Sequence, residues 1–266
     1  MISTTVHLLT LFIYAAISVY LFYCLLRKTP VNRRWLLSGT ACALVVHGVS
    51  IYGLTVTEQG IRVGFFPVST LIFWVINAIV LASSLRKPLH NLFILLAPLT
   101  IIGICASMLG GNSGPQVDLG LSMASHALLS ILAYSLLTIA TLQALLLAWQ
   151  HHQLRHKHPS GSVSLLPPLQ TMETLLFDML WAGVLLLTLS ILSGFVFLDD
   201  MFAQHVAHKT VFSLAAWVIY VVLLWGRHRV GWRGYTAIRW TLAGFVLLML
   251  AYFGSKLVLE LILIRR

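Results

Sequence analysis

Long apolar runs separated by short polar segments follow one another along the whole chain. A membrane-spanning helix needs about 20 mainly apolar residues. Eight stretches meet that requirement: residues 6–27, 35–56, 64–85, 89–109, 118–149, 175–198, 206–226 and 237–263. The pattern therefore predicts an all-α integral membrane protein, a bundle of about eight transmembrane helices that forms a single membrane domain over residues 1–266.

Two of these stretches depart from a simple span. The fifth, 118–149, is too long for one upright crossing, so we expect it to tilt or to project into water near Trp149. The fourth, 89–109, contains Pro98, which is expected to interrupt its helix.

The composition agrees with a lipid environment. Hydrophobic residues make up 59% of the chain and charged residues 9%, whereas about a quarter of the residues of a soluble domain are charged. A bilayer accommodates so much apolar surface because lipid is itself the apolar solvent. The formal net charge of +10 lies in short blocks between apolar runs, which indicates membrane orientation and argues against nucleic acid as a partner.

The number of lysines and arginines is high in the odd-numbered connections between spans and low in the even-numbered ones. The odd connections carry them: Arg27, Lys28, Arg33, Arg34, Arg86, Lys87, Arg155, Lys157, Arg227, Arg229, Arg233 and Arg239. The even connections carry only Arg62 and Lys209 as positive residues, beside Asp118, Asp199 and Asp200. Because positive residues favour the cytoplasmic side, the odd loops are predicted to be cytoplasmic. The N-terminus and the C-terminus are then both outside, in a multi-pass membrane protein.

Two histidines lie at similar predicted depths in the membrane. His47 and His126 each fall about 12 Å below the outer end of their helices, at 1.5 Å per residue. Imidazoles placed in this way on antiparallel helices are able to ligate one haem iron or another metal from opposite sides. A histidine in a membrane helix also serves as a hydrogen-bonding packing residue, so both readings stay open.

Further ionisable residues offer other sites. His205 and His208 are three residues apart and share one face at a helix start, where they either cap a haem from outside or lie among lipid headgroups. Asp178, Lys256 and Glu260 suggest an ion relay, although they follow no evident path. No phosphate-binding loop, dinucleotide motif or nucleophile motif is found in the sequence, so we do not expect an enzyme.

Five segments carry a resemblance to a known family. They are HALLSILAY at 126–134, GVLLLTLSILSGFVF with its Ser-Gly step at 183–197, KTVFSLAAWVIYVVLLWGR at 209–227, GWRG at 231–234 and AYFG at 251–254. These segments resemble the helices of cytochrome c assembly proteins of the CcsA type, over roughly residues 118–256. The whole chain is most similar to the branch of bacterial inner-membrane proteins called YpjD-like.

The resemblance implies a function. In that family a helical bundle presents haem at its outer face for attachment to apocytochrome c, and histidines ligate the haem. Position by position, His126 matches the first family histidine, and His47 is a candidate for a ligand inside the membrane. The resemblance thus implies haem as the cofactor, with His126, His47, His208 and His205 as its ligand candidates, and cytochrome c maturation components or other membrane proteins as partners.

The sequence also departs from the family pattern. The outer segment LDDMFAQHVAHK, 198–209, contains no tryptophan, whereas the family stacks haem on a tryptophan-rich segment there. Trp225 stands where the family has a helix histidine, and the family's final Leu-His-Ser-Tyr element is absent. These departures motivate an alternative: a haem-free accessory or scaffold protein that binds a membrane partner, perhaps in metal-ion homeostasis.

Overall fold

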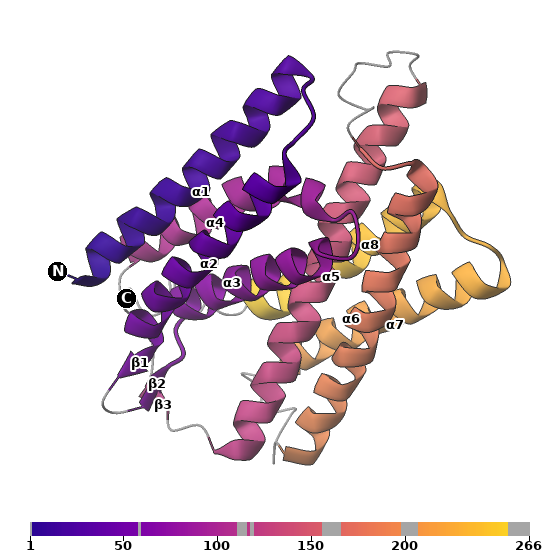
Figure 1. Cartoon of the computed structure of the whole chain (residues 1–266). Helices are drawn as coiled ribbons and strands as arrows, with labels where there is room; N and C mark the ends of the chain where they lie inside the picture. The colour runs from indigo at the N-terminus through magenta and orange to yellow at the C-terminus, as the bar shows by residue number, and fades with distance from the viewer. Residues whose placement is uncertain are drawn as a thin grey trace. The chain divides into compact units, whose positions relative to one another are not determined.

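Eight long helices account for most of the chain. The structure is a computed structural model that describes residues 2–57, 60–110, 116–117, 120–155, 166–197 and 207–254. The helices are α1 (Ile2–Arg27), α2 (Arg33–Thr55), α3 (Phe65–Ser84), α4 (Phe93–Gly110), α5 (Leu121–Arg155), α6 (Leu169–Phe197), α7 (Ala207–Arg229) and α8 (Gly234–Met249) (Figure 1). With residues 90–92 ahead of α4 and 250–252 after α8 included, the described residues provide eight segments long and apolar enough to cross a membrane, which confirms the eight predicted spans. The orientation of the termini stays a prediction.

Three helices bear on the details of the sequence prediction. The predicted interruption at Pro98 is wrong: a 3-10 turn, η1 (His90–Leu92), comes first, and α4 then runs continuously through the proline. Helix α5 has 35 residues, about 52 Å at 1.5 Å per residue, so it exceeds the hydrocarbon thickness as expected. After α8 the chain widens into a π-helical turn, η3 (Leu250–Gly254).

The chain divides into two compact units. Unit 1 comprises Met1–Asp118 with Gln150–Pro168, and unit 2 comprises Leu119–Trp149 with Leu169–Arg266. We describe each unit by itself, and the prediction of a single membrane domain stays a prediction. The span of unit 2 corresponds closely to residues 118–256, where the family resemblance is clearest.

Polar side chains tie the helices of unit 1 together. Asn77 on α3 donates a hydrogen bond of 2.9 Å to the Thr100 hydroxyl on α4, and the Trp74 indole donates one of 2.9 Å to the Leu44 carbonyl on α2. Arg33 donates to the carbonyls of Ser84 and Leu85 and so satisfies the C-terminal end of α3. Such bonds hold apolar helices in register where lipid supplies no driving force between them.

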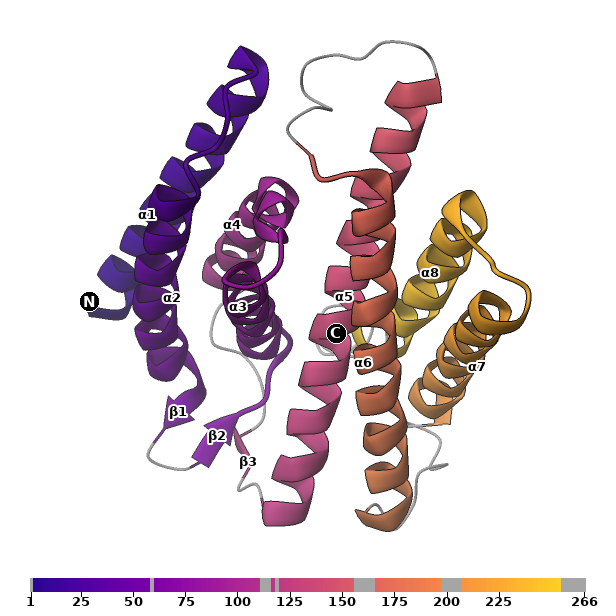
Figure 2. The same cartoon turned by 45° about the vertical axis from the view of Figure 1, so that its right-hand side comes forward.

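A small antiparallel sheet closes the predicted outer end of unit 1. Its strands are β1 (Val56–Thr57), β2 (Gly60–Arg62) and β3 (Gln116–Val117), in the order β1-β2-β3. Val56 faces Ile61, and Ile61 faces Val117 on its other side (Figure 2). The sequence analysis missed these strands because two or three residues are too few to produce a readable alternation.

Glycines allow close packing inside unit 2, where α7 and α8 lie at an incline to α5 and α6 (Figures 1 and 2). A Cβ atom at Gly244 on α8 would lie 2.8 Å from the Tyr220 ring, and one at Gly183 on α6 would lie 2.8 Å from Leu137 on α5. Both distances are shorter than a van der Waals contact, so only glycine fits at these two positions without a shift of the neighbouring side chain.

An ion pair organises the turn between α7 and α8. Arg227 donates to Glu173 at 3.3 Å and to the Trp232 carbonyl at 3.2 Å, and its guanidinium lies 4.5 Å from the centre of the Phe177 ring. Glu173 also accepts from the Gly234 amide. This pairing explains why α6 begins at Leu169, six residues before the predicted start: its acidic residue is neutralised within the protein.

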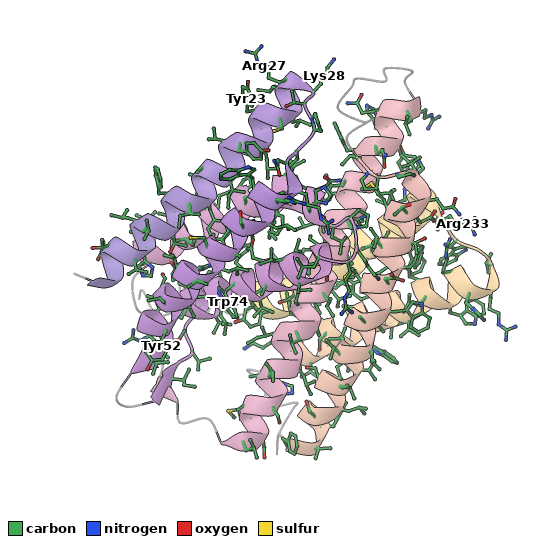
Figure 3. All side chains as sticks on the ribbon, in the orientation of Figure 1. Tyr23, Arg27, Lys28, Tyr52, Trp74 and Arg233 are labelled. Atoms are coloured by element: carbon green, nitrogen blue, oxygen red, sulfur yellow. The ribbon has the colours of Figure 1, made fainter. Side chains whose placement is uncertain are left out.

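Basic side chains project from helix ends in both units. Arg27 and Lys28 are exposed at the end of α1, and Arg233 is exposed in the connection between α7 and α8 (Figure 3). The Arg27 guanidinium lies 5.9 Å from the centre of the Tyr23 ring. Their positions suit charged side chains that leave the hydrocarbon region for water or headgroups.

Candidate functional site

A partly exposed histidine, His126, lies near the start of α5 in unit 2. It follows the first residue of α5 by five positions, which places it about 7.5 Å along the helix axis. Its Nδ1 atom is 2.9 Å from the hydroxyl oxygen of Ser193 on α6. The sequence analysis predicted the histidine but not its serine partner, even though Ser193 belongs to the quoted Ser-Gly step.

The hydrogen bonds of Ser193 favour one tautomer of the imidazole. A serine hydroxyl has one proton to donate, and the Ser193 hydroxyl lies 2.8 Å from the Ser190 carbonyl, which only accepts. With its proton on that carbonyl, Ser193 accepts from His126, and the Nδ1 atom of His126 carries the proton. The Nε2 atom consequently has a lone pair, which is the form that ligates metals.

A second hydroxyl pair holds the same two helices together one turn deeper. Ser130 donates to the His126 carbonyl at 2.8 Å, and its oxygen lies 2.7 Å from the hydroxyl of Ser190. Either hydroxyl of that pair is able to donate to the other. The network fixes the relative position of α5 and α6 beside the imidazole and leaves these three serine protons committed within the protein.

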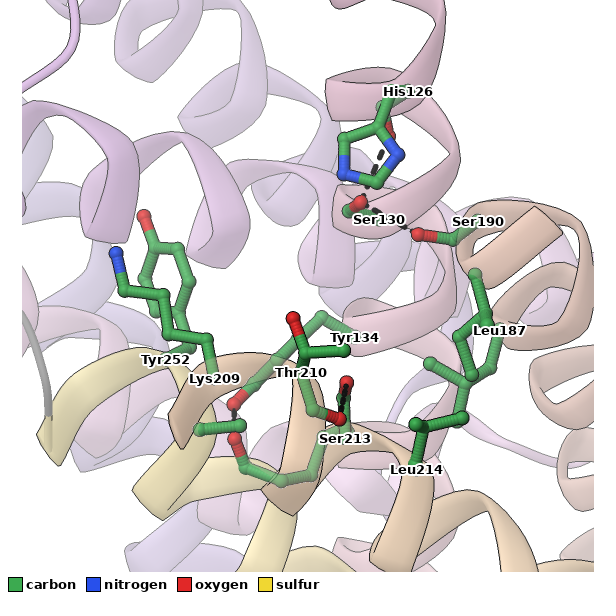
Figure 4. A pocket seen from close by; sticks show the side chains of 13 residues that line it. His126, Ser130, Tyr134, Leu187, Ser190, Lys209, Thr210, Ser213, Leu214 and Tyr252 are labelled. Atoms are coloured by element: carbon green, nitrogen blue, oxygen red, sulfur yellow. Dashed lines mark hydrogen bonds between the residues drawn. The ribbon is translucent and has the colours of Figure 1, made fainter. Parts of the chain in front are cut away.

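A cavity of about 200 Å³ opens beside His126, and all four helices of unit 2 line it (Figure 4). Its lining is mainly apolar with several polar groups, the usual make-up of a small-molecule site. The lining residues are His126, Ser130, Tyr134, Leu187, Ser190, Ile191, Lys209, Thr210, Ser213, Leu214, Leu248, Ala251 and Tyr252.

The π-helical turn η3 forms one wall of this cavity through Ala251 and Tyr252. Tyr134 donates a hydrogen bond to the Leu248 carbonyl, just before the turn, and the rings of Tyr134 and Tyr252 lie 5.5 Å apart between their centres. A π turn disturbs the regular helical hydrogen bonds and is frequent at functional sites. Here it carries the quoted AYFG segment into the wall of the cavity.

Lys209 supplies the permanent charge of the lining. It stands two residues after the start of α7, and in Figure 4 its ammonium and the Tyr252 hydroxyl occupy one end of the cavity, with Leu187 and Leu214 at the other. In the sequence Lys209 is a positive residue in a predicted outer loop. That exception to the charge pattern was the available sequence signal that singled out Lys209.

The second predicted histidine, His47, lies in the core of unit 1. Its side chain on α2 is 0% exposed. Its Nδ1 atom is 3.4 Å from the hydroxyl of Tyr14 on α1, and its Nε2 atom is buried with no hydrogen-bond partner among the residues that the structure describes. Ser50, three residues after His47 on α2, is hydrogen-bonded to His7 on α1. The sequence analysis did not single out His7.

Other predicted residues contribute less to the described site. His47 and His126 belong to different units, so their predicted approach stays a prediction. His205 lies outside the described residues, as do Lys256 and Glu260, and the side chain of His208 is likewise undescribed. Asp178 is exposed on α6. Within the described residues, no group of three or more histidine, cysteine or acidic side chains is placed to hold a metal ion.

Comparison with known proteins identifies related sequences. Residues 35–263 match the family described as "Cytochrome C assembly protein". The chain is 32% identical to the inner membrane protein YpjD of Escherichia coli K12 over 241 residues, which cover 90% of this chain and 91% of the relative. It is 24% identical to the protein HemX of Brevibacillus brevis over 258 residues, 92% of this chain and 93% of the relative. No solved structure matches the chain.

Proposed function

The chain belongs to the cytochrome c assembly protein family, and on that premise we propose that it binds haem in unit 2 of a bacterial inner-membrane protein. His126 provides an axial ligand through Nε2, and the site faces the outer side of the membrane. The protein holds and presents haem without a chemical turnover of its own.

The observation that carries this proposal is the convergence of the family-like segments on one cavity. His126, Ser130 and Tyr134 come from the segment 126–134, and Leu187, Ser190 and Ile191 come from 183–197. The segment 209–227 supplies Lys209, Thr210, Ser213 and Leu214, and 251–254 supplies Ala251 and Tyr252. Four segments that are distant in sequence thus share a single binding surface.

The chemistry of the lining fits haem. The apolar side chains suit a porphyrin ring, and the unprotonated Nε2 atom of His126 suits its iron, which accepts a nitrogen lone pair when haem is bound. The cavity of about 200 Å³ is smaller than the roughly 300–1,000 Å³ of ordinary ligand pockets. A cavity of this size would enclose only one part of the ring and leave the rest accessible, which would suit a protein that presents haem to an acceptor.

We assign the ligand role to His126 before His47. The Nε2 atom of His47 lacks a partner, as a ligand atom would, but the fully buried side chain has no room beside it for a porphyrin. Ligation by His47 would require α1 and α2 to move apart. His208 and His205 remain the candidates for a second iron ligand, and His47 would join them only after such a movement.

A spectrum of the purified protein tests the proposal. The protein is expressed with ample haem, purified in detergent and scanned for a Soret band, which we expect in the wild type. His126→Leu removes the proposed ligand and should lose the band. His228→Leu is its matched control and should leave the band unchanged, because His228 is exposed at the opposite end of α7 from Lys209. A wild-type protein without a Soret band would overturn the proposal.

A second candidate function is a haem-free scaffold for a membrane partner. The tryptophan-free segment 198–209 favours it, because a haem-presenting member of the family is expected to carry an aromatic platform there. The same purification separates the two functions. A stoichiometric partner protein without haem would favour the scaffold, and a haem-loaded chain without a partner would exclude it.

A further inference from the structure

The charge of Lys209 is unusual for its surroundings. The cavity that it lines is mainly apolar, and the residue lies in a connection that otherwise follows the charge pattern of an outer loop. A charged group within or near the hydrocarbon region is costly and is retained chiefly for function. A lysine at a helix end also extends toward headgroups for structural reasons alone, and this alternative is tested below.

Three other polar side chains of the cavity donate to backbone carbonyls. Ser130 donates to the His126 carbonyl, Ser213 to the Thr210 carbonyl and Tyr134 to the Leu248 carbonyl. An ammonium group has three donor hydrogens and no acceptor, so Lys209 is able to offer the ligand a positive charge and a hydrogen bond in addition to its interaction within the protein. The cavity therefore combines an electron-pair donor at His126, an apolar lining and a cation.

This combination has a specific complement. A ligand that fills it has an electron-pair acceptor for His126, an apolar body and a negative group within reach of Lys209. Building on the proposed function, we propose that Lys209 binds a carboxylate of the tetrapyrrole and makes the site selective for the diacid over a neutral tetrapyrrole. His126 then holds the metal, while Lys209 orients the ring in its plane.

The test compares two ligands that differ only in charge. Purified wild-type protein and variants are titrated in neutral detergent with iron protoporphyrin and with its dimethyl ester, and affinity is followed through the Soret band. A hydrogen bond to a charged group corresponds to a preference of about 10- to 100-fold for the diacid. Lys209→Met keeps the length and apolar stem of the side chain and should abolish that preference, with little change in affinity for the diester.

Two variants serve as controls. Lys209→Arg retains the charge and should keep most of the preference for the diacid. Lys28→Met removes an exposed lysine from the end of α1 and should leave both affinities unchanged, which excludes a general effect of net charge on anionic ligands.

Each outcome has a distinct meaning. If the wild type binds neither ligand, the proposed function fails and this inference fails with it. If the wild type binds the two ligands equally, or if Lys209→Met retains the preference, the inference is overturned while haem binding stands. The latter pattern is the one expected of a lysine that merely extends toward lipid headgroups.

Discussion

The two units place a histidine in contrasting environments. His47 in unit 1 is 0% exposed, and its hydrogen bond to Tyr14 is long at 3.4 Å. His126 in unit 2 is partly exposed beside a cavity, and its bond to Ser193 is 2.9 Å. The Ser190 carbonyl beside Ser193 favours the proton on Nδ1 of His126, whereas the Tyr14 hydroxyl is able either to donate to His47 or to accept from it.

The contrast shows that burial alone is a poor guide to ligation. A buried imidazole nitrogen without a partner has a reason to bind something, but it also needs adjacent space. A partly exposed imidazole with a fixed tautomer already has its lone pair available and its ring oriented. We therefore expect haem binding to depend on unit 2 and to tolerate changes at the histidine of unit 1.

Replacing each histidine by leucine is the largest test of this contrast. His126→Leu removes the ligand nitrogen and should abolish the Soret band. His47→Leu should leave haem affinity within about twofold of the wild type, because the proposed haem site is built from residues of unit 2 alone. Absorbance titration of the two variants measures the difference, and the opposite pattern would transfer the ligand role to unit 1.

A double variant separates stability from binding at His47. Tyr14→Phe with His47→Leu replaces both members of the buried pair by apolar groups, an exchange that is often neutral or stabilising. Thermal unfolding should give an unchanged or higher Tm. A lower Tm together with a lost Soret band would mean that unit 1 contributes a polar site of its own.

The bond between Ser193 and His126 should have the next largest effect. Ser193→Ala removes the group that orients the imidazole, and loss of such supporting partners costs about 10- to 100-fold in metal affinity. Ser193→Thr retains a hydroxyl and should bind haem nearly as the wild type does. Haem titration with a measurement of the midpoint potential checks both variants; an unchanged potential in Ser193→Ala would argue against a positioning role.

Helix packing offers a comparison of intermediate size. Gly244→Ala places a Cβ 2.8 Å from the fully buried Tyr220 ring in unit 2, and such overpacking costs about 1–3 kcal/mol. We expect both Tm and haem affinity to fall. Gly103→Ala creates a contact of 2.6 Å with Phe73 in unit 1 and should lower Tm while leaving haem affinity intact.

An open glycine position provides the control for both packing variants. A Cβ at Gly53 on α2 would meet nothing within 4 Å. Gly53→Ala should therefore keep or slightly raise Tm, because alanine is the better helix former. If all three variants lower Tm equally, loss of the glycine itself and not the close contact would be the cause.

Removing the ion pair between Arg227, in the last turn of α7, and Glu173 on α6 should have the smallest effect. Glu173→Gln removes the charge that Arg227 faces but retains an acceptor for the Gly234 amide. Partly exposed ion pairs contribute about 1 kcal/mol or less, so we expect a small decrease in Tm and an unchanged Soret band. Loss of haem in this variant would connect the turn between α7 and α8 to the binding site, contrary to the account.

Position along a helix could be read from the sequence, and direction around it could not. The apolar runs located all eight helices, and the residue count placed His126 near the start of α5. The partner of His126 depends on how α5 and α6 are rotated against each other, which a nearly uniform apolar sequence does not encode. Ser193 and His126 are 67 positions apart, so no local motif joins them.

Lys209 and His7 show two further limits of sequence reasoning. In the sequence Lys209 was only an exception to the charge pattern. Counting charges assigns a residue to one side of the membrane, but it does not show that the residue lines a cavity. His7 lies close to the start of α1, and a polar residue near the end of a membrane helix is common and does not by itself indicate a site. Only the packing of α1 against α2 brings it to Ser50.

Chemical rescue of His126→Gly tests the central claim most directly. This variant removes the imidazole and leaves room for a free one. The account predicts that haem added to the purified variant gives no Soret band resembling the wild type until imidazole is supplied, and that imidazole then restores it. A wild-type Soret band in the variant without imidazole would contradict ligation by His126.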